Sequence, residues 1–196
     1  MTGPILTYTL PAPEVDRAEV LRYARGDARD PQTLALLDRL LEAALPTLTY
    51  RAAVRRVSLA VTGDAVTLGP LTVTSHSLAA HLGEARSALL LAATVGAGMD
   101  RLLLRYARTS PASALLLEGL GAERVEALLA SLDLRLKEDF GRTTRRFSPG
   151  YGDLPLSLQG GLFSLLDCER LLGLTLGESL LMTPKKSVTA ILGLLD

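Results

Sequence analysis

The residues best suited to holding a small polar ligand lie together at positions 146–156, between two segments with a helical pattern. This stretch combines two prolines and two glycines with Arg146 and Tyr151, so its backbone is both stiff and open to close approach. Arg146 carries a planar fork of donors that matches a carboxylate or a phosphate. Tyr151 adds an aromatic face and a hydroxyl group. These residue types predict a binding loop, and a loop that only turns the chain is the alternative.

Other reactive side chains have spacings that do not suit a site. His76 and His81 are five residues apart, so a helix would place them on different faces and not as a pair of metal ligands. Cys168 is the single cysteine and lies within an amphipathic helical pattern, so we expect it to be buried and unreactive. Residues 96–98 lack the third glycine of a dinucleotide motif. We therefore predict no metal site and no catalytic residue.

Composition narrows the class of protein. The chain has 196 residues, of which 48% are hydrophobic, and this predicts a single domain over residues 1–196 with a real core. Lys plus Arg and Asp plus Glu number 21 each, so no net field favours nucleic acid or an anionic membrane. We find neither an export signal nor an apolar run long enough to span a membrane. One cysteine excludes an internal disulfide, and together these features predict a cytoplasmic protein.

Helices are expected where apolar residues recur every three to four positions, particularly after a capping residue such as Asp30 or Ser75. The expected helices cover residues 14–25, 31–44, 75–82, 99–107, 112–117, 122–139 and 157–172. Gly160 and Gly161 are unusual inside the last of these. They indicate either close packing against another backbone or a later start of the helix.

Strands are expected where β-branched residues alternate or an apolar run is continuous. Residues 56–62 and 66–68 should form a hairpin, followed by a short strand at 71–73, and residues 88–95 should form a buried central strand. Residues 174–176 and 188–195 are expected to pair as a hairpin. The mixture lacks a βαβ rhythm, so we predict an α+β fold with a twisted, mainly antiparallel sheet flanked by helices.

The order of several short motifs resembles the C-terminal activation domain of cobalamin-dependent methionine synthase. Residues 146–151 match its R-x-x-P-G-Y loop, and Pro155 follows. Residues 174–175 and 178–179 resemble its L-T-E-S segment, and residues 182–188 match M-x-P-x-x-S-V. Weaker matches at residues 94–96 and 118–122 extend the resemblance over most of the chain. Residues 148–153 are most similar to free-standing members of the family, which lack the homocysteine, folate and cobalamin modules.

The resemblance implies a binding site for S-adenosylmethionine in the loop. Carried over position by position, Arg146 would bind the carboxylate of the ligand. The backbone around Phe147, Pro149 and Gly150 would hold the adenine and ribose. Tyr151 would line the site near the sulfonium, whose positive charge an aromatic face attracts.

A glutamate on the preceding helix also belongs to the site of this family. Glu126 is the nearest match and Glu123 is the alternative, and either carboxylate would meet the ammonium group of the ligand. The chain departs from the long enzymes of the family at three points. An acidic residue of an N-terminal segment and a tyrosine beyond the last strand have no match, and Gly177 replaces the acidic residue of L-T-E-S in one alignment. These departures imply a shallower site, a weaker affinity, or a binding fold without its reaction.

The function implied by the resemblance is reactivation in trans. The protein would support the reductive methylation of cob(II)alamin, using S-adenosylmethionine as methyl donor. The cobalamin would be carried by a separate methionine synthase that lacks its own activation domain, and a reductant protein such as flavodoxin would supply the electron. Whether such a component counts as an enzyme is left open, because its own contribution is positioning. A non-catalytic interaction module for a corrinoid protein or another partner is the alternative, and activation of a different corrinoid methyltransferase is a third option.

Overall fold

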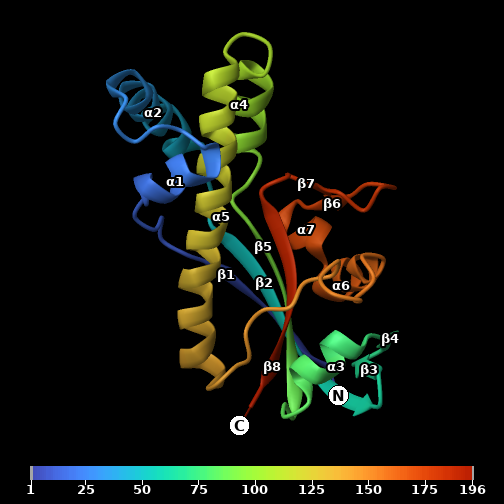
Figure 1. The fold of residues 1–196 in the computed structure, drawn as a ribbon. Helices are drawn as coiled ribbons and strands as arrows, with labels where there is room; N and C mark the ends of the chain where they lie inside the picture. Colours follow the sequence, from blue (N-terminus) through green and yellow to red (C-terminus); the bar gives the residue numbers. More distant parts are fainter. Residues whose placement is uncertain (1, 196) are drawn as a thin grey trace.

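A six-stranded antiparallel sheet is the frame of the computed structural model, which describes residues 2–195 (Figure 1). The strands are β1 (Thr2–Thr9), β2 (Arg51–Thr62), β3 (Ala65–Leu68), β4 (Leu71–Thr74), β5 (Ser87–Thr94), β6 (Thr175–Leu176), β7 (Met182–Thr183) and β8 (Ser187–Leu194). Along the sheet the order is β4-β3-β2-β5-β8, and β1 pairs with β2. The strands β6 and β7 pair only with each other.

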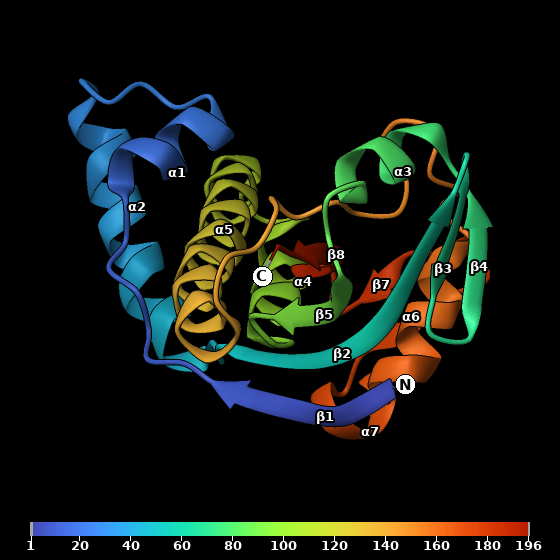
Figure 2. The ribbon, with the colours of Figure 1, turned by 90° about the horizontal axis from the view of Figure 1, so that it is seen from below.

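Helices cover both faces of this sheet (Figures 1 and 2). They are α1 (Arg17–Ala24), α2 (Pro31–Ala44), α3 (His76–Leu82), α4 (Gly98–Tyr106), α5 (Pro111–Phe140), α6 (Leu158–Leu166) and α7 (Cys168–Leu172), with a 3-10 turn, η1 (Leu45–Thr47). On one face Leu132 of α5 shares an apolar cluster with Leu91 of β5, and on the other Leu162 of α6 shares one with Leu90. Among residues 2–195, no helix has both the length and the apolar character needed to cross a membrane.

The strand β5 lies at the centre of the sheet, as its continuous apolar sequence predicts. All eight of its residues are buried, because β2 and β8 flank it and helices cover both faces. The predicted hairpin of β2 and β3, the strand β4 and the helices α2, α3 and α4 are also confirmed. Asp30 and Ser75 cap α2 and α3 with their side chains, as predicted. Residues 2–9, which lie before the first expected helix, form β1.

The prediction of two helices over residues 112–117 and 122–139 is wrong, because α5 is a single helix of 30 residues. The glycines that suggested a break permit close packing instead. A Cβ atom on Gly119 would lie 2.6 Å from the carbonyl oxygen of Val20 in α1. A Cβ atom on Gly121 would lie 2.6 Å from Cε of Lys186. Each glycine costs a helix about 1 kcal/mol relative to alanine, and this packing against α1 and Lys186 offsets the cost.

The C-terminal third also differs from the prediction in two places. Residues 157–172 form two helices, α6 and α7, because Asp167 between them takes a left-handed conformation with φ 50°. Within α6, a Cβ atom on Gly161 would lie 2.8 Å from Cδ2 of Leu71, so this glycine packs against a side chain and not, as one of the two explanations had it, against another backbone. The predicted pairing of residues 174–176 with residues 188–195 is wrong. The β6 strand pairs with β7, and β8 joins the main sheet beside β5.

Candidate functional site

The edge of β8 positions the predicted binding loop. After α5 ends, residues 142–147 run along this edge, and the chain continues toward α3 (Figure 2). The N–H of Phe147 donates to the carbonyl oxygen of Ile191 at 2.9 Å, and the N–H of Ile191 donates back at 2.8 Å. The N–H of Thr144 donates to the carbonyl oxygen of Gly193 at 2.9 Å. The side chain of Arg146 therefore projects from a backbone that the sheet holds in place.

This pairing stops at Pro149, and Thr189 on the same edge of β8 is buried, with 2% of its surface exposed. The backbone groups of Ile191 and Gly193 form hydrogen bonds on the side of β8 that faces away from β5. The carbonyl oxygens of Lys186 and Leu194 accept hydrogen bonds on the β5 side. Because directions alternate in an antiparallel ladder, the N–H and C=O of Thr189 also face the outer edge. The position opposite Thr189 would fall to Pro149, which has no N–H to donate.

Arg146 lies between two carboxylates of α5. Its Nη2 donates to Oε2 of Glu126 at 3.4 Å, and its Nη1 lies 3.1 Å from Oδ2 of Asp133. Glu126 and Asp133 are seven residues apart, which is two helical turns, so they share one face of α5. The structure thus brings the predicted pair Arg146 and Glu126 together and adds Asp133, which the sequence analysis missed.

Two atoms in this cluster are buried without a hydrogen-bond partner: Oδ1 of Asp133 and Nη1 of Arg146. The 3.1 Å approach of Nη1 to Asp133 is therefore an ion pair without hydrogen-bond geometry. Loss of water through burial raises the pKa of Asp133, Arg146 and Lys137 oppose this shift, and Glu126 adds to it. The cluster lacks one acceptor for its arginine and one donor for its aspartate.

Aromatic rings line the other side of the loop. The ring of Phe147 lies 5.1 Å from that of His81 and 6.3 Å, edge-on, from that of Tyr151, measured between centroids. Nε2 of His81 lies 2.7 Å from the carbonyl oxygen of Arg145, which fixes this imidazole on the loop. Tyr151 itself is 62% exposed. Its ring is therefore largely exposed, and its predicted contact with a ligand stays a prediction.

The turn that follows depends on left-handed glycines. Gly150 has φ 91° and Gly152 has φ 56°, values that other residues adopt with strain. A Cβ atom on Gly152 would lie 2.7 Å from Oγ of Ser77, so this glycine is also required by packing. On Gly150 the nearest atom would be Cδ1 of Leu156 at 3.5 Å, an ordinary contact. Gly150 is therefore required by its backbone angle and has open space beside it.

Asp153 fastens this turn to the start of α3. Its carboxylate accepts hydrogen bonds from Oγ of Ser75 at 2.6 Å, from the N–H of His76 at 2.8 Å and from the N–H of Ser77 at 3.1 Å. The bond from Ser75, with the two backbone bonds, lowers the pKa of Asp153 far below its usual range. No local pattern could have identified this role, because its partners lie more than 70 positions earlier in the chain.

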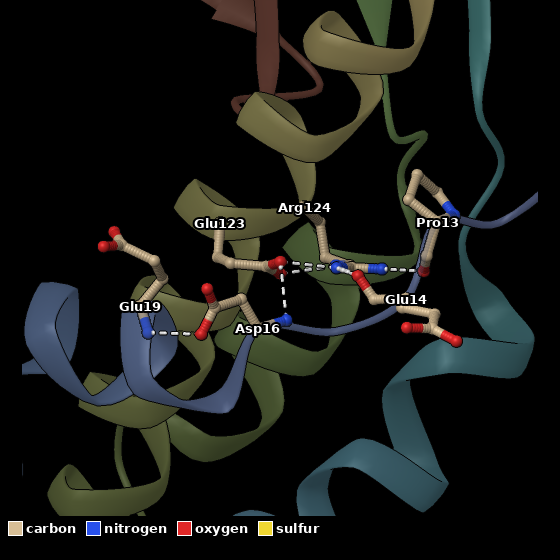
Figure 3. A network of polar contacts seen from close by, with 6 residues as sticks. All are labelled: Pro13, Glu14, Asp16, Glu19, Glu123 and Arg124. Atoms are coloured by element: carbon tan, nitrogen blue, oxygen red, sulfur yellow. Dashed lines mark hydrogen bonds and ion pairs between the residues drawn. The ribbon is translucent and has the colours of Figure 1, made fainter.

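Glu123, the alternative to Glu126, belongs to a buried network (Figure 3). Both carboxylate oxygens of Glu123 accept from the fully buried Arg124, and Oε1 also accepts from the N–H of Asp16 at 3.1 Å. Arg124 in turn donates to the carbonyl oxygens of Pro13 and Glu14, at 2.6 Å each. Glu123 therefore fixes the N-terminal segment to α5, whereas Glu126 faces Arg146.

Of two hollows on the surface, only the smaller one lies beside a residue of the predicted site. A small hollow of about 220 Å³ lies between α5 and the start of β8, and Glu126 and Ser187 are among its lining residues. A larger, mostly apolar hollow of about 600 Å³ lies away from the loop, between α4 and α5, where Leu104 and Leu115 line it. Glu126 is the member of the Arg146 cluster that lines the small hollow.

Residues 2–195 contain no group of three His, Cys, Asp or Glu side chains placed to hold an ion. His76 pairs with Asp64, with Nδ1 3.0 Å from Oδ1. Cys168 is buried, as predicted, and burial raises the pKa of its thiol to about 12, which makes it a poor nucleophile.

Comparison with known proteins identifies the fold. No family model matches the sequence, and no curated protein sequence matches it significantly. Among solved structures, the chain is similar to the crystal structure of the MetH reactivation domain bound to AdoHcy, with a TM-score of 0.70 over 97% of this chain and 78% of the other. The chain has the fold of the methionine synthase reactivation domain. Sequence identity is 15%, so the reactivation-domain fold is shared across a wide sequence divergence. The predicted α+β class is confirmed, while the ligand roles of Arg146, Glu126 and the loop stay a prediction.

Proposed function

We propose that this protein binds S-adenosylmethionine at the loop of residues 146–156 and supports reductive methylation of the cobalamin of a separate methionine synthase. The observation that carries the proposal is Arg146, which lies beside the edge of β8 within reach of Glu126 on α5. The fold also supports the proposal, because the chain is similar to a MetH reactivation domain that is bound to AdoHcy.

The amino-acid end of the ligand fits the charges of the cluster. Arg146 offers two parallel donors, which suit a carboxylate. Glu126 lies 3.4 Å from Arg146 and is half exposed, so its carboxylate can turn to an ammonium group beside that carboxylate. Tyr151, exposed next to Phe147, offers its ring to the sulfonium.

The adenosine end requires a revised assignment within the loop. Both backbone groups of Phe147 already bond to Ile191, which leaves its carbonyl oxygen one lone pair for a further donor. Pro149 donates no hydrogen bond to Thr189, the next outward-facing residue on the same edge. We place the adenosine along this edge, with Gly150 allowing close approach because nothing nearer than 3.5 Å would meet a Cβ atom there.

In the proposed role the protein positions the methyl donor and does not itself react. The cobalamin of the partner supplies the nucleophile once a reductant protein such as flavodoxin has delivered an electron. The methyl group moves from the sulfonium to cobalt, and S-adenosylhomocysteine is the leaving group. The described residues lack a nucleophile suited to this transfer, since the thiol of Cys168 is buried and remains protonated at neutral pH.

A non-catalytic interaction module remains the alternative, and one observation favours it. Arg146 is already neutralised by Glu126 and Asp133, and the adjoining hollow is only about 220 Å³. Such a module would bind a corrinoid protein or another partner without S-adenosylmethionine. A titration with S-adenosylmethionine separates the two functions, because the module need not bind it. If S-adenosylmethionine binds but methionine synthase is not rescued, a different corrinoid methyltransferase becomes the next partner to test.

The decisive assay for the proposed function follows methylcobalamin formation by absorbance. It contains an oxidised, cobalamin-loaded methionine synthase without its own activation domain, a reductant and S-adenosylmethionine. We expect methylcobalamin only when this protein is added. Arg146→Ala should abolish most of the effect, while Arg29→Ala, at a side chain that is 92% exposed, should not change it. Equal rescue of the synthase with and without the protein would remove the reactivation role.

A further inference from the structure

Arg146 has two carboxylate neighbours in the structure, although a guanidinium that binds a ligand carboxylate requires none. One guanidinium faces two carboxylates, Glu126 and Asp133, so Arg146 already has more than one anionic partner before a ligand enters. Lys137 is the other cation close enough to influence Asp133. A ligand that brought only a carboxylate would add a third negative charge and would have to compete with two carboxylates for Arg146. An α-amino acid group brings a positive charge along with its carboxylate and avoids this conflict.

The two orphaned atoms are complementary to such a group. Nη1 of Arg146 is a buried donor without an acceptor, and Oδ1 of Asp133 is a buried acceptor without a donor. An α-amino acid carries a carboxylate and an ammonium group on the same carbon atom, so one ligand group can supply both missing partners. The described structure leaves each of these atoms unsatisfied although they belong to side chains in direct contact.

Asp133 is better placed than Glu126 to recognise the ammonium group. The Asp133 side chain is 30% exposed, against 54% for Glu126. Water screens a charge pair less where it is partly excluded, so an ammonium group gains more from Asp133 than from the more exposed Glu126. Glu126 also already accepts a hydrogen bond from Arg146, although a long one at 3.4 Å.

From this juxtaposition we propose that Asp133 is a specificity-determining residue that binds the ligand's ammonium group and selects zwitterionic amino-acid ligands over simple carboxylates. This inference rests on the proposed function of the loop. It adds a residue that neither the motifs nor the fold comparison assigns. On ligand binding Arg146 exchanges Asp133 for the ligand carboxylate, and Asp133 exchanges Arg146 for the ligand ammonium.

The test pairs a change in the protein with a change in the ligand. S-adenosylhomocysteine and its analogue without the α-amino group are titrated calorimetrically into wild type, Asp133→Asn and Asp133→Glu. We expect Asp133→Asn to weaken S-adenosylhomocysteine binding at least ten-fold and to leave the affinity for the analogue within about two-fold, in line with the loss of one charge-assisted hydrogen bond. Asp133→Glu keeps the charge and should restore part of the discrimination between the two ligands.

The outcomes separate this inference from the proposed function. If wild type binds S-adenosylhomocysteine and Asp133→Asn weakens both ligands equally, Asp133 only positions Arg146 and the inference is wrong. It is also wrong if Asp133→Asn changes neither affinity. If wild type does not bind S-adenosylhomocysteine at all, the proposed function fails first and the inference fails with it. Circular dichroism of both variants is the control for folding. We expect Asp133→Asn to fold, because asparagine has the same shape as aspartate.

Discussion

Removal of the buried guanidinium of Arg124 should strongly destabilise the fold. Arg124→Met keeps most of the side-chain volume but leaves Glu123, only 5% exposed, without its counter-ion. The carbonyl oxygens of Pro13 and Glu14 lose their donors as well. This network joins the N-terminal segment to α5 (Figure 3), so its loss should lower the free energy of unfolding.

The expected loss is about 3–5 kcal/mol, the usual result of removing one partner of a buried ion pair. For a chain of this length each kcal/mol shifts the thermal midpoint by about 2–4 °C, so the midpoint should fall by roughly 6–20 °C. Urea and thermal denaturation followed by circular dichroism measure both quantities. Arg17→Met is the matched control, because its partner Asp38 and Arg17 itself are half exposed, and it should cost less than about 1 kcal/mol.

Two further variants sharpen this test. Replacing both partners, as Glu123→Leu with Arg124→Met, should recover most of the loss, since no charge is then left buried and unpaired. Glu126→Gln should behave in the opposite way, with little change in stability and weaker ligand binding. A loss for Arg124→Met no larger than that for Arg17→Met would refute the structural role of the pair and would reopen Glu123 as a candidate ligand residue.

Three other changes have defined outcomes. Gly150→Val should cost about 1–3 kcal/mol because φ is 91°, and should weaken S-adenosylhomocysteine binding more than ten-fold; an unchanged affinity in a titration would exclude this turn from the site. S-adenosylhomocysteine binding should strengthen as pH rises through the raised pKa of Asp133, because only the ionised carboxylate attracts an ammonium group; Arg146, Lys137 and Glu126 are the charged groups that set this pKa, and Asp133→Asn should flatten the profile. Cys168 should resist a thiol reagent at pH 8 in the folded protein and react in urea, since burial raises its pKa to about 12; rapid labelling of the folded protein would contradict this.

Local sequence signals predicted the elements that depend on local chemistry. Asp30 before Pro31 predicted the start of α2, because aspartate is a preferred N-cap and proline is a preferred first residue of a helix. The apolar run of β5 predicted a strand buried on both faces. Gly119 and Gly121 resemble a helix break in sequence for a physical reason. A glycine that ends a helix and a glycine that admits a neighbouring backbone look alike in sequence, and only the position of α1 and Lys186 separates them.

The parts of the site that sequence could not supply are contacts between distant segments. Arg146 was identified by its residue type and loop, but its two carboxylates lie 13 and 20 positions earlier on α5. Asp133 carried no signal, since an aspartate on a helix face is usually a solvated charge. The partner of β8 also followed from the whole sheet, because the edge of β5 offers eight residue pairs and the β6 strand only two. These choices depend on tertiary packing, which acts after local propensity is satisfied.

The most direct test of the central claim is a calorimetric titration of S-adenosylhomocysteine into the wild-type protein and into Arg146→Ala, with Arg29→Ala as control. Each hydrogen bond between a charged donor and a carboxylate contributes about 1.5–3 kcal/mol, and 1.4 kcal/mol corresponds to a ten-fold change in affinity. We predict that wild type and Arg29→Ala bind with the same affinity, that Arg146→Ala loses ten-fold or more, and that Arg146→Lys recovers only part of the loss. Equal binding by wild type and Arg146→Ala, or no binding by wild type, would contradict the account.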